Sequence, residues 1–364
     1  MKIVKLSLVF FYLSFSNSIA FQKKNISESP HITPNTLELF SLETSIANDG
    51  GNEYFIYHAC DIAKDSKNNL YIIDYMDDDG FIKMFDKNGS FIRLLGNQGG
   101  GPTELDRPRK ILINNNRIYV FQKFSGLKVL NNNWKYIDNY RFHRFDDEAT
   151  VYYLNEHAYF YTYAMGQSFN VIKKLDLRTD STTILYKYSE PENTGSGFYS
   201  PRTFALNSKG EFYLSKDSEK YLIEKYDEHG NHILSFGREY KRKPFSSETR
   251  KYFEENYGDY VKQGRRPPQP KFPAIIRKVL IDNHDLLWII TGEWKLDTYN
   301  ETVICETIDI FTGEGKYLYS FESDYFGPIS SLRNGKLFSV MYPDKETAEQ
   351  NIRIFKIDYS NLLK

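Results

Sequence analysis

Hydrophobic and polar residues follow a repeating pattern along this chain of 364 residues. An apolar residue followed directly by an aromatic one recurs six times, at Leu70-Tyr71, Ile118-Tyr119, Ala158-Tyr159, Phe212-Tyr213, Leu287-Trp288 and Leu337-Phe338. Most of the intervals are close to the roughly 40–50 residues of a four-stranded propeller blade. The pattern therefore predicts an all-β fold, a six-bladed β-propeller with four antiparallel strands in each blade.

The first blade shows its four strands clearly, at 61–63, 70–74, 81–85 and 91–95. The last two are separated by Asp86-Lys87-Asn88-Gly89, in which the Asp side chain can accept backbone hydrogen bonds and the Gly can supply a positive φ. This predicts a hairpin turn. The same device returns at Asp227-Glu228-His229-Gly230, three blades later.

The remaining blades are placed by the aromatic pairs. They are expected at about 109–142, 150–187, 202–237, 276–321 and 329–357. A ring of blades leaves an unpaired edge unless a strand from the other end of the chain closes it. The segment Thr36–Leu42 alternates apolar and polar residues before blade one. We expect this strand to complete the sixth blade.

One insertion, residues 238–273, interrupts the repeat between blades four and five. A short helix is expected after Pro244 with Ser246 or Ser247 as its cap, because Phe253, Tyr257 and Val261 then fall on one helical face. The prolines at 267, 268 and 270 require an extended return to blade five. The insertion could be a lid over the central channel. Alternatively, it could only bury Phe253 and Tyr257 at the edge of the propeller.

Residues 1–20 have the features of a secretory signal peptide: Lys2 and Lys5, a mostly apolar run over 6–15, and the small residues Ser18-Ile19-Ala20. The apolar run is about half the roughly 20 residues that span a bilayer. We therefore expect a secreted or periplasmic protein with no membrane span after cleavage, an extension at 21–34 and one propeller domain at 35–364.

The composition supports β structure and limits the partners. Aromatic residues make up 16% of the chain, with 29 Tyr and 27 Phe, and such side chains suit half-buried pleated sheets. Lys and Arg total 47 against 48 Asp and Glu, so the chain has no excess of positive charge that would attract nucleic acid. Cys60 and Cys305 fall in blades that do not touch, which predicts no disulfide between them. A monomer is expected.

Several segments of blade one carry a family resemblance. They are Asp61-Ile62-Ala63-Lys64-Asp65, Asn69–Asp74, Ile82–Asp86, Gly96–Pro102 and Arg107-Pro108. Together they resemble the signature of NHL repeats, and the chain is similar to the NHL-like six-bladed propellers of exported bacterial proteins. Blades two and three depart from the signature because they lack the glycine turn between their outer strands. The resemblance implies the fold and no single activity, since one fold hosts many functions.

The candidate binding residues lie where the inner strands begin, at one end of the central channel. Alignment of the blades on their aromatic pairs places Cys60, Arg109, Thr150, Arg202, Arg277 and Gly327 at this position. Convergent guanidinium groups can bind carboxylate, sulfate or phosphate through paired donors. Arg265 and Arg266 of the insertion could add to this field. Alternatively, each Arg pairs with a nearby carboxylate such as Glu104, Asp106 or Glu148 and only ties loops together.

Other motifs point less clearly to chemistry. Asp77-Asp78-Asp79-Gly80 could wrap calcium but lacks a distal bidentate Glu, which favours a solvated loop and no cofactor. Gly99-Gly100-Gly101 is not followed by the Gly-Lys-Ser/Thr of a phosphate cradle and is expected to be an inter-blade loop. Of seven histidines, His58 lies nearest the channel mouth and is the best candidate for binding or acid–base work.

Two functions remain open from the sequence. The first is a non-catalytic binding propeller that recognises a small anionic ligand, a glycan or an envelope protein at the loop face of the channel mouth. The alternative is a metal-dependent propeller enzyme, either lactonase- or esterase-like or an NHL-type lyase. The aligned positions supply few convergent Asp, Glu, Asn and His residues, which favours the binding protein.

Overall fold

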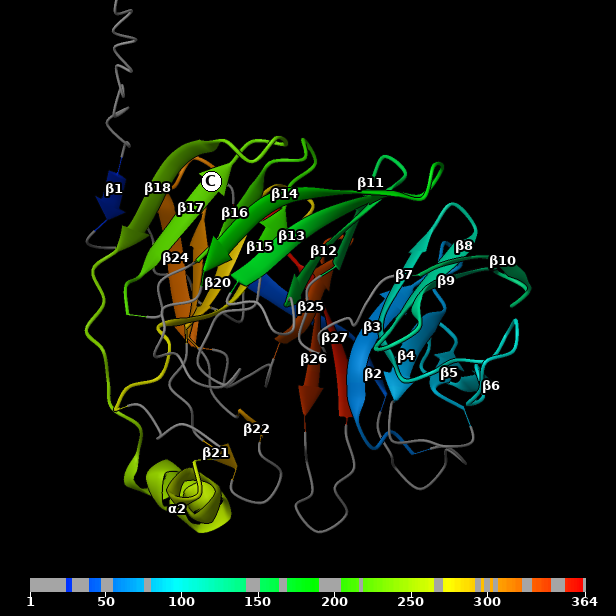
Figure 1. Cartoon of the computed structure of the whole chain (residues 1–364), viewed down its shortest axis with the longest axis horizontal. Helices are drawn as coiled ribbons and strands as arrows, with labels where there is room; N and C mark the ends of the chain where they lie inside the picture. Colours follow the sequence, from blue (N-terminus) through cyan, green and yellow to red (C-terminus); the bar gives the residue numbers. More distant parts are fainter. Residues whose placement is uncertain are drawn as a thin grey trace, which may run out of the picture.

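Six sheets, each built on four antiparallel strands, form the blades of a propeller (Figure 1). The computed structural model describes residues 24–27, 39–46, 55–74, 80–141, 151–163, 169–189, 204–215, 219–264, 271–291, 296–297, 302–303, 307–322, 329–341 and 351–362. The predicted all-β class and blade number are confirmed. Within the parts that the structure describes, no helix has the length and apolar character needed to cross a membrane.

The first three blades follow one another without interruption. Blade one contains β3 (Ala59–Lys64), β4 (Leu70–Asp74), β5 (Ile82–Phe85) and β6 (Phe91–Leu95). Blade two contains β7 (Pro108–Asn114), β8 (Arg117–Gln122), β9 (Gly126–Asn131) and β10 (Tyr136–Tyr140). Blade three contains β11 (Val151–Leu154), β12 (His157–Tyr163), β13 (Phe169–Asp176) and β14 (Ser181–Ser189). In each blade the first strand is the innermost.

The last three blades complete the ring. Blade four contains β15 (Phe204–Leu206), β16 (Phe212–Leu214), β17 (Leu222–Tyr226) and β18 (His232–Arg238). Blade five contains β19 (Ile276–Ile281), β20 (Leu287–Thr291), β23 (Thr307–Phe311) and β24 (Tyr317–Glu322). Blade six contains β25 (Ile329–Arg333), β26 (Lys336–Met341), β27 (Asn351–Ile357) and β2 (Phe40–Ile46), and α3 (Tyr359–Leu362) follows it. The sequence placed each blade to within two residues of these bounds.

The closing strand pairs as predicted but lies further along the chain. β2 runs antiparallel to β27 at the outer edge of blade six, which closes the ring. The alternation over 36–42 gave the wrong bounds, because only Phe40 and Ile46 at the two ends of β2 are buried. The register shifts between Leu42 and Thr44, and Leu42, an apolar residue of the predicted strand, is exposed.

The apolar-aromatic pairs have a clear physical role. Each lies on the second strand of its blade, and successive side chains of a strand point to opposite faces. In blade one, Leu70 packs in the core shared with blade six and Tyr71 in the core shared with blade two. In blade five, Leu287 packs toward blade four and Trp288 toward blade six. The core of the protein therefore lies between blades.

The insertion contains the predicted helix, α2 (Ser247–Lys262), which stands apart from the sheets at the lower left of Figure 1. Ser246 caps it by accepting a hydrogen bond from Thr249 N at 3.1 Å. Phe253 packs on Phe245 and on Tyr257, with ring centroids 6.2 and 5.7 Å apart. The predicted apolar face is thus covered in part by the segment that leads into the helix.

Two features were not expected from the sequence. The extension contributes β1 (Lys24–Ser27), which pairs in parallel with β18 and adds a fifth strand to blade four. Along the chain, the hairpin of β21 (Leu296–Asp297) and β22 (Thr302–Val303) falls between the second and third strands of blade five. Both were missed because such short segments carry too little periodicity to be distinguished from loops.

Candidate functional site

Three of the six aligned positions share a backbone feature, a β-bulge at the start of the inner strand. The pairing register shifts across Cys60 in blade one, Arg109 in blade two and Arg277 in blade five, and each is the extra residue of its strand. In blade six the extra residue is Ser330, three positions after the Gly327 of the sequence alignment. A bulge turns a side chain away from the regular alternation of the strand.

His58 and Arg109 lie near enough for the charge of Arg109 to act on the imidazole. The backbone N–H groups of Tyr57 and His58 donate to the Asp74 carboxylate at 2.7 and 2.9 Å, which fixes this segment, and Asp74 also forms a buried ion pair with Lys83. Burial lowers the pKa of His58, and the positive charge of Arg109 lowers it further, while Asp74 opposes both. His58 is therefore neutral at neutral pH.

Of the other predicted site residues, the structure describes only some. Arg277 is half-buried on β19. Arg202, Arg265 and Arg266 lie outside the described residues. Asp77, Asp78, Asp79 and Cys305 also lie outside them, and Cys60 is a free thiol whose pKa burial raises to about 12. Among the residues that are described, no group of three or more His, Cys, Asp or Glu could hold a metal ion.

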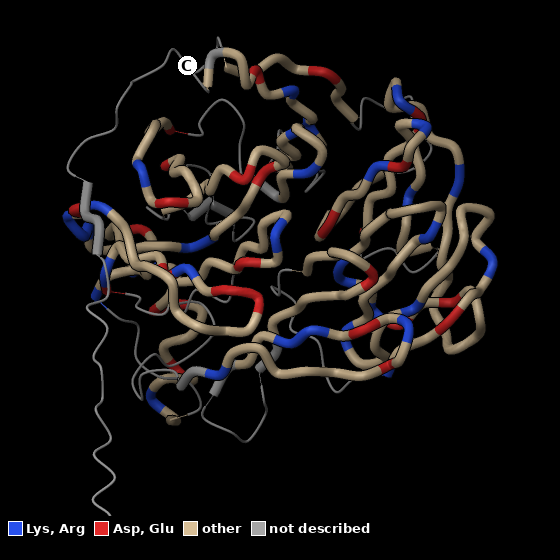
Figure 2. Tube along the Cα trace, turned by 90° about the horizontal axis from the view of Figure 1, so that it is seen from above, with Lys and Arg blue, Asp and Glu red and all other residues tan. Residues whose placement is uncertain are grey.

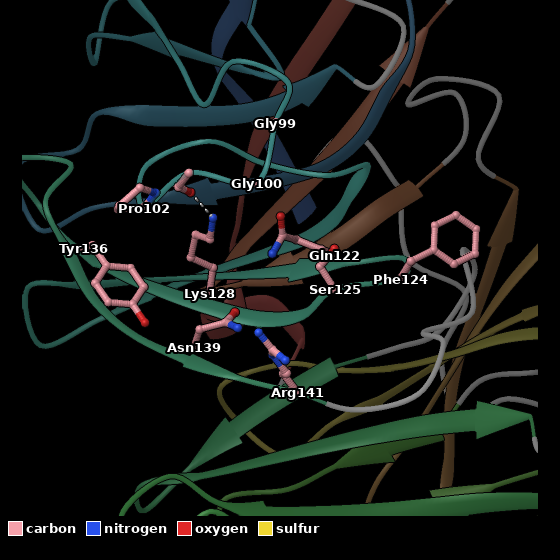
Figure 3. A pocket seen from close by; sticks show the side chains of 11 residues that line it. Gly99, Gly100, Pro102, Gln122, Phe124, Ser125, Lys128, Tyr136, Asn139 and Arg141 are labelled. Atoms are coloured by element: carbon pink, nitrogen blue, oxygen red, sulfur yellow. Dashed lines mark hydrogen bonds between the residues drawn. The ribbon is translucent and has the colours of Figure 1, made fainter.

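A cavity of about 820 Å³ lies on blade two, beneath the loop that joins blades one and two (Figure 3). We call it the blade-two pocket. Its lining residues are Gly99, Gly100, Gly101, Pro102, Gln122, Phe124, Ser125, Lys128, Tyr136, Asn139 and Arg141. They include two cations, two amides, two hydroxyls and two aromatic rings, and none of the described lining residues is Asp or Glu.

The wall of the pocket is a tightly bonded loop, not a phosphate cradle. Gly101 N donates to the Glu104 carboxylate at 2.7 Å, and Gly99 N donates to the Leu105 carbonyl at 3.0 Å. Two glycine N–H groups are therefore used inside the loop instead of facing a ligand. Next to it, Ser125 Oγ donates to Asp106 at 2.7 Å. The predicted inter-blade role of the glycines is confirmed.

Lys128 on β9 provides the main positive charge of the pocket. It is only 6% exposed. Its ammonium donates to the carbonyl of Gly101 at 2.7 Å and to that of Glu104, and so holds the loop against the sheet. An ammonium has three N–H donors, and no third bond is formed within the described chain. Burial lowers the pKa of Lys128, while the Glu104 carboxylate opposes this effect.

Two other blades show what a buried lysine on the third strand ordinarily requires. Lys83 on β5 forms an ion pair with Asp74 at 2.9 Å, and Lys225 on β17 forms one with Glu211 at 3.0 Å. Lys128 occupies the third strand of blade two and has no carboxylate within 4.0 Å among the described residues. A buried charge without a counterion carries a desolvation penalty of several kcal/mol, and an anion in the pocket would offset this penalty in addition to the two carbonyl bonds.

Polar groups beside Lys128 also have hydrogen-bonding capacity that the described chain does not use (Figure 3). Gln122 Oε1 accepts the N–H of Asp106 at 2.7 Å, which leaves the amide nitrogen of Gln122 to the pocket. Asn139 is the cross-strand neighbour of Lys128. Its Oδ1 atom is buried and has no hydrogen-bond partner within the described chain. The pocket therefore presents unused donors and one unused acceptor.

The sequence reasoning missed this pocket. Figure 2 shows Lys and Arg interspersed with Asp and Glu along the trace, so no cluster of charge marks the site. One signal was available in Gly126-Leu127-Lys128-Val129-Leu130, where a charged residue interrupts a strand that is otherwise buried. This signal is ambiguous, because the ion-paired Lys83 and Lys225 interrupt their strands in the same way.

The comparisons with known proteins agree with this fold. Residues 52–228 match the family model DUF5128, described as a 6-bladed beta-propeller. No curated protein matches the chain. The structure is similar to that of a member of the DUF4221 family from Bacteroides vulgatus, with 13% identity, a TM-score of 0.60, and 88% of this chain and 99% of that chain covered.

A second solved structure shows the same likeness. It is a Bacteroides fragilis protein, provisionally described as exported, with 12% identity and a TM-score of 0.51. The similarity covers 92% of this chain and 99% of that chain. At such low identities these similarities support the propeller fold, and they assign no ligand.

Proposed function

We propose that this chain is an extracytoplasmic binding protein that captures a small anionic ligand in the blade-two pocket, without chemical turnover. The observation that carries this proposal is the buried ammonium of Lys128, which has no carboxylate partner and retains a free N–H donor beside the cavity. Arg141 supplies a second, exposed cation to the same lining. An anionic ligand would neutralise both and would meet no acidic side chain among the described lining residues.

The extracytoplasmic location of the protein is part of the same proposal. The signal-like residues 1–20 support export, and so does the similarity to a protein provisionally described as exported. We also propose that the repeats are of the NHL type, on the strength of the segments in blade one. His58 and Arg109 would add a second polar cluster near the channel mouth, while a ring of arginines that includes Arg202 and Arg277 stays a prediction.

Thermal-shift measurements with citrate, inorganic phosphate and glucuronate as probes test the anion site. At least one probe should raise the melting temperature of the parent protein, and the shift should shrink as salt concentration rises. Lys128→Met should abolish the shift, because it removes the charge and keeps a side chain of similar length. Arg141→Ala should weaken it severalfold. The control is Arg178→Ala, at an exposed site in blade three, which should keep the parent's shift.

Circular dichroism should confirm that each variant is folded. If Lys128→Met fails to fold, the exposed Arg141 carries the test, because its removal disturbs no packing. An undiminished shift in both Lys128→Met and Arg141→Ala would place anion binding elsewhere on the molecule and would reject the pocket.

A further inference from the structure

We infer that the ligand of the blade-two pocket is an acidic sugar, a molecule that carries several hydroxyl groups together with a carboxylate or a sulfate. This inference rests on the proposed function and adds the chemical class of the ligand. It depends on three properties of the pocket: the sign of its charge, its mixture of open donors and acceptors, and the placement of its aromatic rings.

The charge of the lining selects an anion and disfavours an amine. Lys128 and Arg141 are both cations, and none of the lining residues that the structure describes is acidic. Arg107 and Lys123 lie over the ring of Phe124 at the edge of the pocket, 5.5 and 5.6 Å from its centroid, and extend the positive region. A ligand with an ammonium group would be repelled by these four cations, which makes amino acids and polyamines poor candidates.

The unused hydrogen-bonding groups require more than an anion. Lys128 and the Gln122 amide nitrogen are donors, and an oxyanion can satisfy them as an acceptor. Asn139 Oδ1 is a buried acceptor, and an ionised carboxylate or sulfate has no hydrogen to give it. A hydroxyl group both donates and accepts. A ligand with hydroxyls next to its acidic group satisfies all three side chains at once.

Aromatic rings at two ends of the lining fit the apolar faces of sugar rings. Tyr136 and Phe124 lie on opposite sides of Lys128 and Asn139 in Figure 3. They are 46% and 49% exposed, so each offers an open ring face or edge to a ligand. The volume of about 820 Å³ is in the range of sites that enclose ligands larger than a single small ion. A short acidic oligosaccharide matches this layout.

Isothermal titration calorimetry with four probes tests the inference on the full chain. The probes are a trigalacturonate, its methyl ester, the hydroxyl-free acid tricarballylate and a sulfated disaccharide. The trigalacturonate or the sulfated disaccharide should bind, and the comparison between them identifies the preferred acid. The methyl ester and tricarballylate should each bind at least about tenfold more weakly than the better acidic sugar. The ester lacks the negative charge, and tricarballylate lacks the hydroxyl groups.

Two variants separate the roles of charge and hydroxyl recognition. Asn139→Leu should reduce the affinity for the acidic sugar about tenfold or more and leave that for tricarballylate unchanged, since only the hydroxyl contact is lost. Lys128→Met should weaken both. Asn133→Leu is the matched control: it makes the same change at an exposed turn of the same hairpin and should bind like the parent.

The outcomes distinguish this inference from the proposed function. If tricarballylate binds as tightly as the acidic sugars, the anion site stands and the sugar class is wrong. If Asn139→Leu leaves the preference for the acidic sugar intact, the hydroxyl contact is likewise wrong. If the methyl ester binds as tightly as the acid, or if no probe gives heat, both the anion site and the inference are rejected.

Discussion

Arg333 on β25 joins blade six to blade one by donating to both carboxylate oxygens of Asp61 on β3, at 3.1 and 3.0 Å. The same guanidinium donates to the carbonyl of Ile62 in blade one at 2.8 Å and to that of Ile111 in blade two at 2.6 Å. Asp61 in turn accepts the N–H of Ile111 at 2.8 Å. The inner strands of three blades are thus held together by one buried carboxylate and one guanidinium.

Replacement of Arg333 by Met should destabilise the fold strongly. Asp61 would remain buried without its cation, and the loss of one partner of a buried pair costs about 3–5 kcal/mol. Urea unfolding followed by circular dichroism measures this cost. Arg178→Met, at an exposed surface pair, is the control and should change stability by less than about 1 kcal/mol. Equal effects of the two variants would show that Arg333 does not hold the blades together.

The contrast between the aromatic pairs and Arg333 shows how far the sequence could lead. Leu70 and Tyr71 pack toward opposite neighbours, so their adjacency is a local signal that repeats in every blade. The contact of Arg333 with Asp61 spans 272 residues and exists only because the ring closes. No local pattern marks it. The fold was therefore readable from the sequence, whereas the residue that ties the inner strands was not.

The candidate site was hidden for a related reason. Lys128 stands out because no carboxylate of the described residues forms an ion pair with it, and that fact depends on which elements pack around β9. The positions of Cys60, Arg109 and Arg277 could be aligned from the sequence, because each lies nine or ten residues before the aromatic pair of its blade. Where their side chains point, and what they meet, depends on packing between blades.

The pH dependence of stability should carry a contribution from His58. Its pKa lies below the ordinary value of 6.5, chiefly because burial disfavours the imidazolium. The unfolded chain therefore binds a proton at pH values where folded His58 does not, so stability rises with pH across this window. The contribution is complete above about pH 6.5 and is lost as the pH falls from there toward the folded pKa.

Unfolding free energies measured by urea titration between pH 5 and 7.5 check this expectation. His58→Gln should flatten the decline of stability on the acid side, because the glutamine binds no proton in either state. His229→Gln, at an exposed turn, should show the same decline as the parent. A parent-like decline in His58→Gln would mean that other groups govern stability in this range.

Adjacent glycines of the pocket loop should differ sharply in their tolerance of alanine. A Cβ atom at Gly99, where φ is +154°, would lie 2.0 Å from Glu104 Oε2, whereas one at Gly100 would meet no atom within 4 Å. In Gly99→Ala the Glu104 carboxylate must move and lose its bond to Gly101 N, a loss of about 1.5–3 kcal/mol for a charged hydrogen bond. Gly100→Ala should stay within about 0.5 kcal/mol of the parent.

Thermal unfolding of the two glycine variants gives the comparison directly. Gly99→Ala should melt several degrees below Gly100→Ala, and its anion-induced shift should also be smaller, because the same loop forms the wall of the pocket. Similar melting temperatures would indicate that the loop rearranges freely and that the Glu104 bond contributes little to its shape.

The closing strand should depend on Phe40 far more than on Leu42. Phe40 is 5% exposed and packs on Trp288 and Phe321 of blade five, with ring centroids 6.0 and 5.5 Å apart. Phe40→Ala should therefore cost about 3–5 kcal/mol, the range for truncation of a buried aromatic side chain. Leu42→Ala, on the same strand but 50% exposed, should cost less than about 1 kcal/mol.

The outcomes show what closes the ring. Among the described strands of blade six, only β2 comes from the start of the chain, so a large cost at Phe40 alone would show that its buried end holds the ring closed. Equal costs at both positions would mean that backbone pairing with β27 suffices.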